Sequence, residues 1–282
     1  MSENGNITVE DFDNRPTVTM SRREIISGLA TGTVVAFSGA ALSGCVTNSA
    51  LGRKQFLLVS DAELEQLSAA SWNQLLTQNR QTNDPALRRQ VAAVGDRIVR
   101  GADQRLPDFG LTQRNWEFAV FDDPTVNAWV MPGGKVGFHT GLLDVTQNDD
   151  QIATVMGHEV GHVVGRHAAE RYSQQMAASS GLALANVALA DNENRGLIAG
   201  ILGAGVTFGV ILPYSRKHEY EADRLGADFM VDANYRANEA VRFWDGMTQR
   251  SSQKPMEFMS THPSDQSRIA TMQSYITSQG YV

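Results

Sequence analysis

The feature that most constrains this sequence is a histidine-glutamate-x-x-histidine pattern at residues 158–162, inside an apolar stretch. Residues four apart project from one side of an α-helix, so the imidazoles of His158 and His162 can reach one metal ion. Glu159 lies beside the first histidine, where its carboxylate can touch a water on that ion rather than the ion itself. The flanking residues are apolar at helical spacing. The pattern therefore predicts a buried helix that carries a zinc site and a general base.

A third ligand must come from another part of the chain, because catalytic zinc sites use three side chains. His167 is one candidate, but a metzincin would place its third histidine at position 168, which is alanine. Glu193 follows an asparagine, as the ligand does in thermolysin-like enzymes, yet the residue one turn later is not acidic. Glu221 qualifies by residue type alone. Spacing therefore favours none of these three residues.

Glu219 fits the third position best. Asp223 follows it by four residues, which places both carboxylates on one face of a predicted helix. From one turn away, Asp223 can accept the second N–H of a ligating histidine, whereas Glu221 points away from that face. We therefore expect one Zn²⁺ per chain, held by His158, His162 and Glu219.

Composition favours a folded α+β protein. The 282 residues are 42% hydrophobic with a single cysteine, which excludes an internal disulfide framework and a cysteine-based zinc cluster. The net charge of −7 argues against a nucleic-acid partner. Most segments show helical periodicity and only residues 116–139 resemble strands. We therefore expect a mostly helical domain with one small antiparallel sheet.

Local signals define the expected elements. Helices should begin at residues 61 and 85, and the second should stop at Gly101. His139 and His218 are expected to be solvated. Strands are expected at 116–121, 126–131 and 135–139, and further helices at 141–145, 151–169, 216–231, 237–249 and 263–278.

The first 44 residues resemble an export signal rather than part of the fold. Arg22 and Arg23 precede an uncharged, glycine-rich run that ends in a lipobox-like sequence at Cys45. The paired arginines resemble a twin-arginine signal, with Sec export as the alternative. A membrane-spanning anchor is a weaker alternative, because the run is short and glycine-rich.

This interpretation sets the expected boundaries and location. Residues 1–44 would be a signal peptide, 45–59 a tether, and 60–282 a single zinc metallopeptidase domain. A lipid on Cys45 would anchor the protein in the bacterial cell envelope, facing the periplasm. Val46 after the cysteine favours the outer membrane over the inner one.

Four segments in a fixed order resemble metallopeptidase family forty-eight, the family of the CAAX prenyl protease, HtpX, the BepA-like periplasmic enzymes and a mitochondrial inner-membrane stress protease. Besides the motif at 158–162, these are the segments 127–135, 215–223 and 261–269. Trp129 replaces a phenylalanine that is usual in the family. No tetratricopeptide tail follows the fourth segment, so we expect the short periplasmic lipoprotein branch.

The resemblance implies a zinc endopeptidase of the gluzincin type. Carried over by position, His158, His162 and Glu219 would be the ligands and Glu159 the base. Asp223 would accept a hydrogen bond from a ligand histidine.

The resemblance also implies a substrate strand and a fourth histidine near the metal. The strand carries Asn127, Ala128, Gly133 and Gly134, and it would bind an extended substrate main chain to main chain. His262 would stabilise the oxyanion or take the water's coordination position; a cap-region histidine before a helix is the alternative.

The leading hypothesis is a zinc endopeptidase that acts on unfolded or misassembled cell-envelope proteins, with Glu159 and His262 as catalytic residues. The rival is a lipoprotein chaperone or assembly factor on the same fold, which the intact motif disfavours. An exopeptidase would need a group that recognises a chain terminus, and we find no motif for one. The uncharged segment 172–215 is expected to form a helical hairpin over the cleft, with a membrane hairpin as the alternative.

Overall fold

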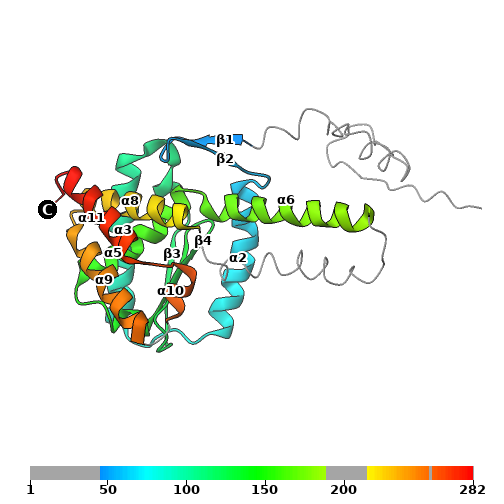
Figure 1. The fold of residues 1–282 in the computed structure, drawn as a ribbon. Coiled ribbons are helices and arrows are strands. Elements are labelled where there is room, and N and C mark those ends of the chain that lie inside the picture. The colour runs from blue at the N-terminus through cyan, green and yellow to red at the C-terminus, as the bar shows by residue number, and fades with distance from the viewer. Residues whose placement is uncertain (1–44, 189–214, 254–255, 282) are drawn as a thin grey trace, which may run out of the picture.

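The computed structural model describes residues 45–188, 215–253 and 256–281. The export segment, residues 1–44, lies outside the described residues. So do residues 189–214 of the expected hairpin, which include Glu193. Helices surround a small sheet, as Figure 1 shows. The expected α+β class is therefore confirmed.

The central element is helix α5, Asp149–Val164. It begins where the Asn148 side chain accepts a hydrogen bond from the backbone N–H of Gln151. All residues from 151 to 162 are buried, because four elements pack around this helix: α3 (Pro85–Arg105), α8 (Arg216–Asp232), α9 (Asn238–Gln253) and β4 (Ala128–Met131). The histidine-glutamate-x-x-histidine motif thus lies inside the protein.

Helix α8, Arg216–Asp232, crosses α5 at very short range. A Cβ on Gly161 would lie 2.7 Å from the backbone oxygen of Ala222, and one on Gly157 would lie 2.9 Å from that of Gly226. Larger side chains would hold the two helices apart. The small residues therefore bring the first turns of α8 against the motif.

Helices α2, Asp61–Gln78, and α3, Pro85–Arg105, begin at residues 61 and 85 as predicted. Helix α3 runs past Gly101, so the predicted stop there is wrong. A Cβ on Gly101 would lie 2.8 Å from the backbone nitrogen of Ala233. This glycine therefore allows close packing against the end of α8 rather than a helix end.

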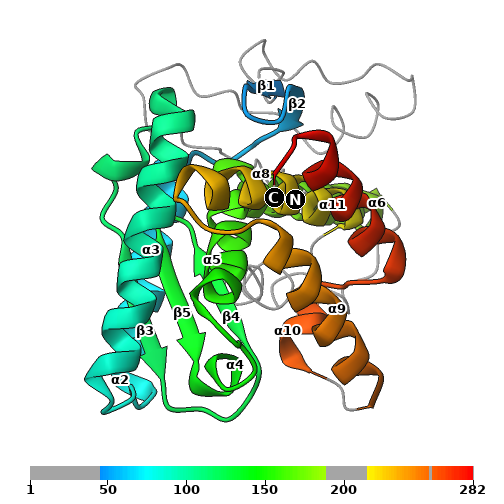
Figure 2. The same ribbon diagram turned by 90° about the vertical axis from the view of Figure 1, so that its left-hand side faces the viewer.

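The main sheet contains β3, Glu117–Phe121, β4, Ala128–Met131, and β5, Lys135–His139. Figure 2 shows them side by side in the order β3, β5, β4. β5 is antiparallel to β4 but parallel to β3, so the predicted antiparallel sheet is in fact mixed. The connection after β3 carries the chain to the far edge before β5 returns to the centre.

A tight turn joins β4 to β5. The Gly134 N–H donates to the Met131 oxygen at 3.1 Å, and Gly133 has φ +82°. Proline at the second position and glycine at the third are typical of a type II turn. The turn leaves β4 on the edge of the sheet, and no strand among the described residues pairs with its other side.

The expected tether forms a two-stranded hairpin, β1, Cys45–Asn48, and β2, Arg53–Phe56. The Asn48 side chain donates to the Val164 oxygen at 2.9 Å, and the Gln55 side chain donates to the Gly165 oxygen at 2.7 Å. The hairpin thereby binds the carbonyls at the end of α5. Residues 45–56 are therefore part of the folded domain, which corrects the boundary at residue 60.

The single helix predicted over 151–169 is broken at Arg166, which has φ +52°. Helix α6, His167–Ala188, starts there and extends away from the body (Figure 1). The remaining helices are α4, Thr140–Leu143, α9, Asn238–Gln253, α10, Glu257–Thr261, and α11, Gln266–Ser278, with short 3-10 turns at Pro107–Phe109 and Leu111–Gln113. Within the described residues, no helix has the length and apolar character needed to cross a membrane.

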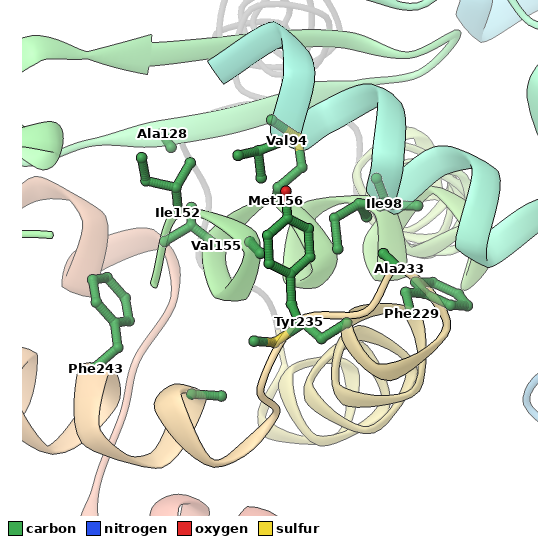
Figure 3. Close-up of a cluster of buried hydrophobic side chains, with 14 of the residues drawn as sticks. Val94, Ile98, Ala128, Ile152, Val155, Met156, Phe229, Ala233, Tyr235 and Phe243 are labelled. Atoms are coloured by element: carbon green, nitrogen blue, oxygen red, sulfur yellow. The ribbon is translucent and has the colours of Figure 1, made fainter. Parts of the chain in front are cut away.

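A continuous apolar cluster lies behind the motif helix (Figure 3). Ile98 from α3, Met156 from α5, Phe229 from α8 and Phe243 from α9 are almost fully buried in it. Burying each such side chain contributes about 2 kcal/mol. This packing fixes α5 and α8 relative to each other, and so fixes the side chains they present to one another.

Candidate metal centre

Two helices and a loop bring four nitrogen and oxygen donors together. His158 and His162 come from α5, and Glu219 comes from the first turn of α8. The two imidazole Nε2 atoms lie 3.1 Å apart; Glu219 Oε2 lies 3.4 Å from that of His158, and Glu219 Oε1 lies 3.4 Å from that of His162. Their side chains are 1% exposed, so the donors are shielded from bulk water.

His262, which follows α10, completes the set. Its Nδ1 lies 3.1 Å from His158 Nε2 and 3.4 Å from a Glu219 oxygen. Tetrahedral donors about 2.1 Å from a zinc ion lie about 3.4 Å from one another. The spacing of these four residues therefore fits a tetrahedral metal site.

The polar atoms of Glu219 support the same fit. Both carboxylate oxygens are buried, and Oε2 is paired with the Arg268 guanidinium at 2.7 Å, whereas Oε1 makes no hydrogen bond with a described group and lies 3.4 Å from His162 Nε2 and from His262 Nδ1. A buried carboxylate oxygen normally has a hydrogen-bond partner, so Oε1, which faces two imidazoles without one, suits a metal cation. The His/Glu cluster can therefore hold a metal ion.

Charges around the centre also favour a cation. Burial alone would lower the pKa of His158, but the carboxylates of Asp223 and Glu219 raise it to about 9. Burial would raise the pKa of Glu219, but the Arg268 guanidinium and His262 hold it well below its usual value. The carboxylate of Glu219 is thus ionised and available as a ligand.

Asp223 holds His158 as expected, with its oxygen 2.9 Å from His158 Nδ1. Arg268 of α11 in turn donates to both Asp223 oxygens, at 2.6 and 2.8 Å, and lies 2.7 Å from a Glu219 oxygen. It is buried against Trp244. The sequence motif contained Arg268, but its spacing gave no sign of this role.

Glu159 lies beside the donor set without belonging to it. One of its oxygens is 3.4 Å from His262 Nε2, and a backbone hydrogen bond from Val130 of β4 reaches its carboxylate. Its burial raises the pKa of Glu159 above the usual value of 4.5. A raised pKa makes a carboxylate a better proton acceptor, as a general base requires.

Two rejected ligand candidates lie outside the donor set. His167 contacts the back of His162, with 2.9 Å between their Nδ1 atoms, and Glu221 contacts His167. His218 is buried and hydrogen-bonds Glu170, so the expectation that it is solvated is wrong. Packing of α6 against the start of α8 encloses it, which local sequence does not reveal.

The predicted substrate strand is the edge strand β4, but its residues differ in role. The Asn127 oxygen accepts from the His139 N–H at 3.0 Å, so the alternation of an antiparallel pair points the backbones of Ala128 and Val130 away from β5, on the side where Val130 reaches Glu159. Gly134 is buried at the turn. His139 is half-buried at the end of β5 rather than solvated.

A shallow pocket lies between this edge strand and the motif helix. Its apolar wall includes Leu64, Val130, Pro132 and Val163, and His162 opens into it. Gly133 also borders it. The pocket therefore adjoins both the edge strand and the donor set.

Comparison with known proteins gives the family. Residues 85–276 match the family described as "Peptidase family M48". The chain belongs to peptidase family M48. The four sequence segments behind the predicted resemblance lie within this matched region, so that prediction is confirmed.

Named relatives come from both mitochondria and bacteria. The chain is 37% identical to mitochondrial metalloendopeptidase OMA1 of Schizosaccharomyces pombe, over 59% of this chain and 48% of that protein. It is 31% identical to mitochondrial metalloendopeptidase OMA1 of Bos taurus, over 77% of this chain and 42% of that protein. It is 29% identical to the beta-barrel assembly-enhancing protease of Escherichia coli, over 67% of this chain and 38% of that protein. The matches thus span less than half the length of these relatives.

Proposed function

We propose that this protein is a zinc metalloendopeptidase. The observation that carries the proposal is the convergence of His158, His162, Glu219 and His262 at tetrahedral spacing, with Glu159 beside them. Two imidazoles and a carboxylate are a typical catalytic zinc set. The names of the relatives, metalloendopeptidase and protease, agree with this activity.

The chain's own residues have separable tasks in this proposal. His158, His162 and Glu219 hold the ion, and the open edge of β4 orients an extended substrate. Glu159, with its raised pKa, accepts the proton of the attacking water and passes it to the leaving amine. The zinc ion, when bound, lowers the pKa of a water and polarises the scissile carbonyl.

His262 acts as a block in this arrangement. Its Nδ1 takes the fourth corner of the donor set, which a catalytic site keeps for water and substrate. His262 must leave that corner before catalysis. The geometry favours this role over oxyanion stabilisation, which would require an open corner.

The physiological role extends the proposal. We propose that the substrates are unfolded or misassembled proteins of the bacterial cell envelope and that a lipid on Cys45 anchors the protein at the membrane. Cys45 is exposed at the start of β1, where a lipid would not disturb the fold. Metabolic labelling with a fatty-acid analogue should mark the wild-type protein and not Cys45→Ser.

Casein digestion by the chain from residue 46 onward tests the activity. Glu159→Gln should keep zinc and fold but lower kcat by about 10²–10⁴, and a chelator should abolish cleavage. His262→Ala should raise activity if the histidine blocks the site and lower it if it stabilises the oxyanion. Equal cleavage by Glu159→Gln and wild type would contradict the mechanism, whereas no cleavage by the wild-type protein would favour the chaperone alternative.

A further inference from the structure

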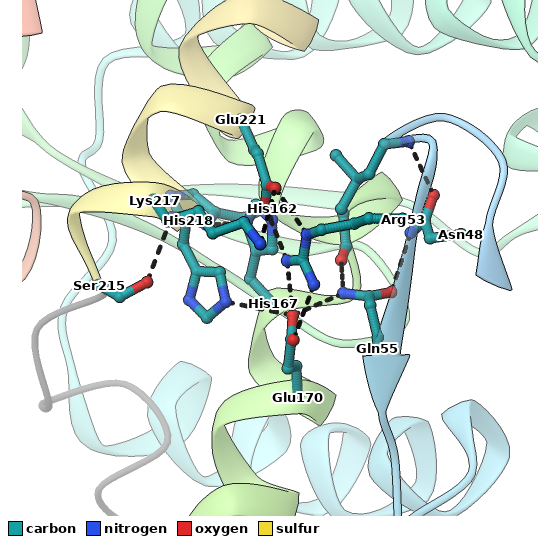
Figure 4. A network of polar contacts seen from close by, with 12 residues as sticks. Asn48, Arg53, Gln55, His162, His167, Glu170, Ser215, Lys217, His218 and Glu221 are labelled. Atoms are coloured by element: carbon teal, nitrogen blue, oxygen red, sulfur yellow. Dashed lines mark hydrogen bonds and ion pairs between the residues drawn. The ribbon is translucent and has the colours of Figure 1, made fainter. Parts of the chain in front are cut away.

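A second buried polar cluster lies behind the metal centre, and the proposed mechanism does not use it (Figure 4). His167, the first residue of α6, is fully buried at its heart. A Cβ on Gly165 would lie 2.4 Å from His167 Nε2, so glycine at 165 makes room for this ring. The cluster also contains Glu221 of α8 and Arg53 of the N-terminal hairpin.

The hydrogen bonds of this cluster have a defined direction. Nε2 of His162 faces the other donors, so a ligating His162 carries its proton on Nδ1. That Nδ1–H donates to His167 Nδ1 at 2.9 Å. His167 then carries its own proton on Nε2, which donates to a Glu221 oxygen at 3.1 Å.

Arg53 fixes the outer end of this chain of contacts. Its Nε and Nη2 donate to the two Glu221 oxygens at 2.6 and 2.8 Å. Two further nitrogen–oxygen contacts, at 2.8 and 2.7 Å, join it to Glu170. Glu221 therefore cannot rotate away from His167 without breaking a bidentate ion pair.

We propose that His167, held by Glu221 and Arg53, is the positioning residue for the metal ligand His162. This proposal rests on the metal site proposed above. It gives His162 the same kind of support that Asp223 gives His158, and it makes the N-terminal hairpin a structural part of the metal centre. Such partners fix the tautomer and the orientation of a ligand ring.

A second metal ion in the cluster is the competing explanation, because His167, His218 and Glu221 also place donors close together. The Arg53 guanidinium argues against it, since it already pairs with both carboxylates of the cluster. An ion there would have to displace Arg53 from four hydrogen-bonding contacts. The charges therefore favour a series of hydrogen bonds from His162 through His167 and Glu221 to Arg53, here called the relay, over a second ion.

Two substitutions of His167 separate positioning from packing. Asparagine places an oxygen near the Nδ1 position and keeps an acceptor for His162. Glutamine places its amide near the Nε2 position and keeps a donor for Glu221. His167→Gln should lower Zn²⁺ affinity on the order of 10–100-fold, and His167→Asn by less than about tenfold.

Zinc affinity is measured on the full mature chain by competition with a chromophoric chelator. The absorption spectrum of the Co²⁺-loaded protein reports ligand geometry, and circular dichroism of the metal-free protein reports folding. The Co²⁺ bands should shift in His167→Gln and stay near wild type in His167→Asn. Glu221→Gln should weaken affinity without changing zinc content at saturation.

His218→Gln is the matched control. His218 stacks on His167, with ring centroids 4.4 Å apart, but its ring hydrogen-bonds the carboxylate of Glu170. This control should lower stability while leaving Zn²⁺ affinity within about threefold, since it spares the bond to His162. Equal losses in His167→Gln, His167→Asn and His218→Gln would overturn the positioning role and leave a packing role.

His162→Ala separates the two proposals. Loss of zinc in His162→Ala together with wild-type affinity in both His167 variants would overturn the relay alone. Wild-type affinity in His162→Ala would overturn the metal site and the relay with it. A second bound zinc equivalent that His167→Gln removes would overturn the relay in favour of a second ion.

Discussion

The two ligand histidines of α5 are supported in different ways. His158 is held by Asp223, whose carboxylate is locked by Arg268 in a region that water does not reach. His162 is held by the imidazole of His167, which leads outward to Glu221 and Arg53. The side chains of Glu221 and Arg53 are 14% and 16% exposed, whereas those of Asp223 and Arg268 are 4% and 1% exposed.

Asp223 and Arg268, here called the inner support, are charged and buried. His167, Glu221, Glu170 and Arg53, here called the outer support, are partly exposed to water at their charged end. The inner support comes from the C-terminal helices α8 and α11, and the outer one ends in the N-terminal hairpin. Buried charges depend on their partners far more than hydrated charges do. The inner support should therefore control stability most strongly, while the outer support can be weakened without unfolding the protein.

The largest effect is expected from Arg268→Met. This change leaves the carboxylates of Asp223 and Glu219 buried without their cation, which should lower the free energy of unfolding by about 3–5 kcal/mol. Arg53→Met makes the same change in the outer support and should cost about 1–2 kcal/mol, because water can replace part of the lost pairing. Urea denaturation of the metal-free proteins measures both, and equal losses would remove the distinction.

A smaller effect is expected from Gly161→Ala, which tests the helix crossing that both supports share. The new Cβ would meet the backbone oxygen of Ala222 at 2.7 Å, and that atom cannot move unless α8 moves. We expect a loss of about 1–3 kcal/mol and weaker zinc binding, because Glu219 moves with α8. Gly246→Ala is the control: a Cβ there meets nothing within 4 Å, so stability should stay or rise slightly.

Much of this arrangement follows from local sequence. The motif at 158–162 and the spacing of Glu219 and Asp223 predicted the residues that converge, because helical periodicity alone sets which side chains share a face. The helix starts at Asp61 and Pro85 were also predicted from their capping residues. These are properties of neighbouring residues in the chain.

The outer support could not be predicted in the same way. Its contacts join residues far apart in sequence, such as Arg53 and Glu221, and no period connects them. Gly165 accommodates the ring of His167, and no sequence period marks that contact. The hairpin at 45–56 resembled a tether because its buried residues, Asn48 and Gln55, are polar. Their partners are backbone carbonyls, which sequence patterns do not reveal.

The smallest effect concerns the pH dependence of the outer support. Burial would raise the pKa of Glu170, but hydrogen bonds from Arg53 and Gln55 hold it at about 2. The pKa of Glu221 is likewise held at about 2 against its burial, by His167 and Arg53. Both values lie below the usual value of 4.5, so the folded state binds fewer protons than the unfolded state between these limits.

The stabilisation from these carboxylates is therefore complete above about pH 4.5 and is lost as the pH falls toward about 2. Glu170→Gln has no charge to lose at this position, so its free energy of unfolding should fall less steeply with acid than that of wild type. Solvent screening limits the expected difference to about 1 kcal/mol over this window. Urea denaturation of both metal-free proteins across this pH range measures it, and the contribution of the metal ligands cancels in the comparison. Parallel curves would mean that the pairing of Glu170 with Arg53 does not stabilise the folded state, and that the ion pair of Arg53 with Glu221 carries the charged part of the outer support.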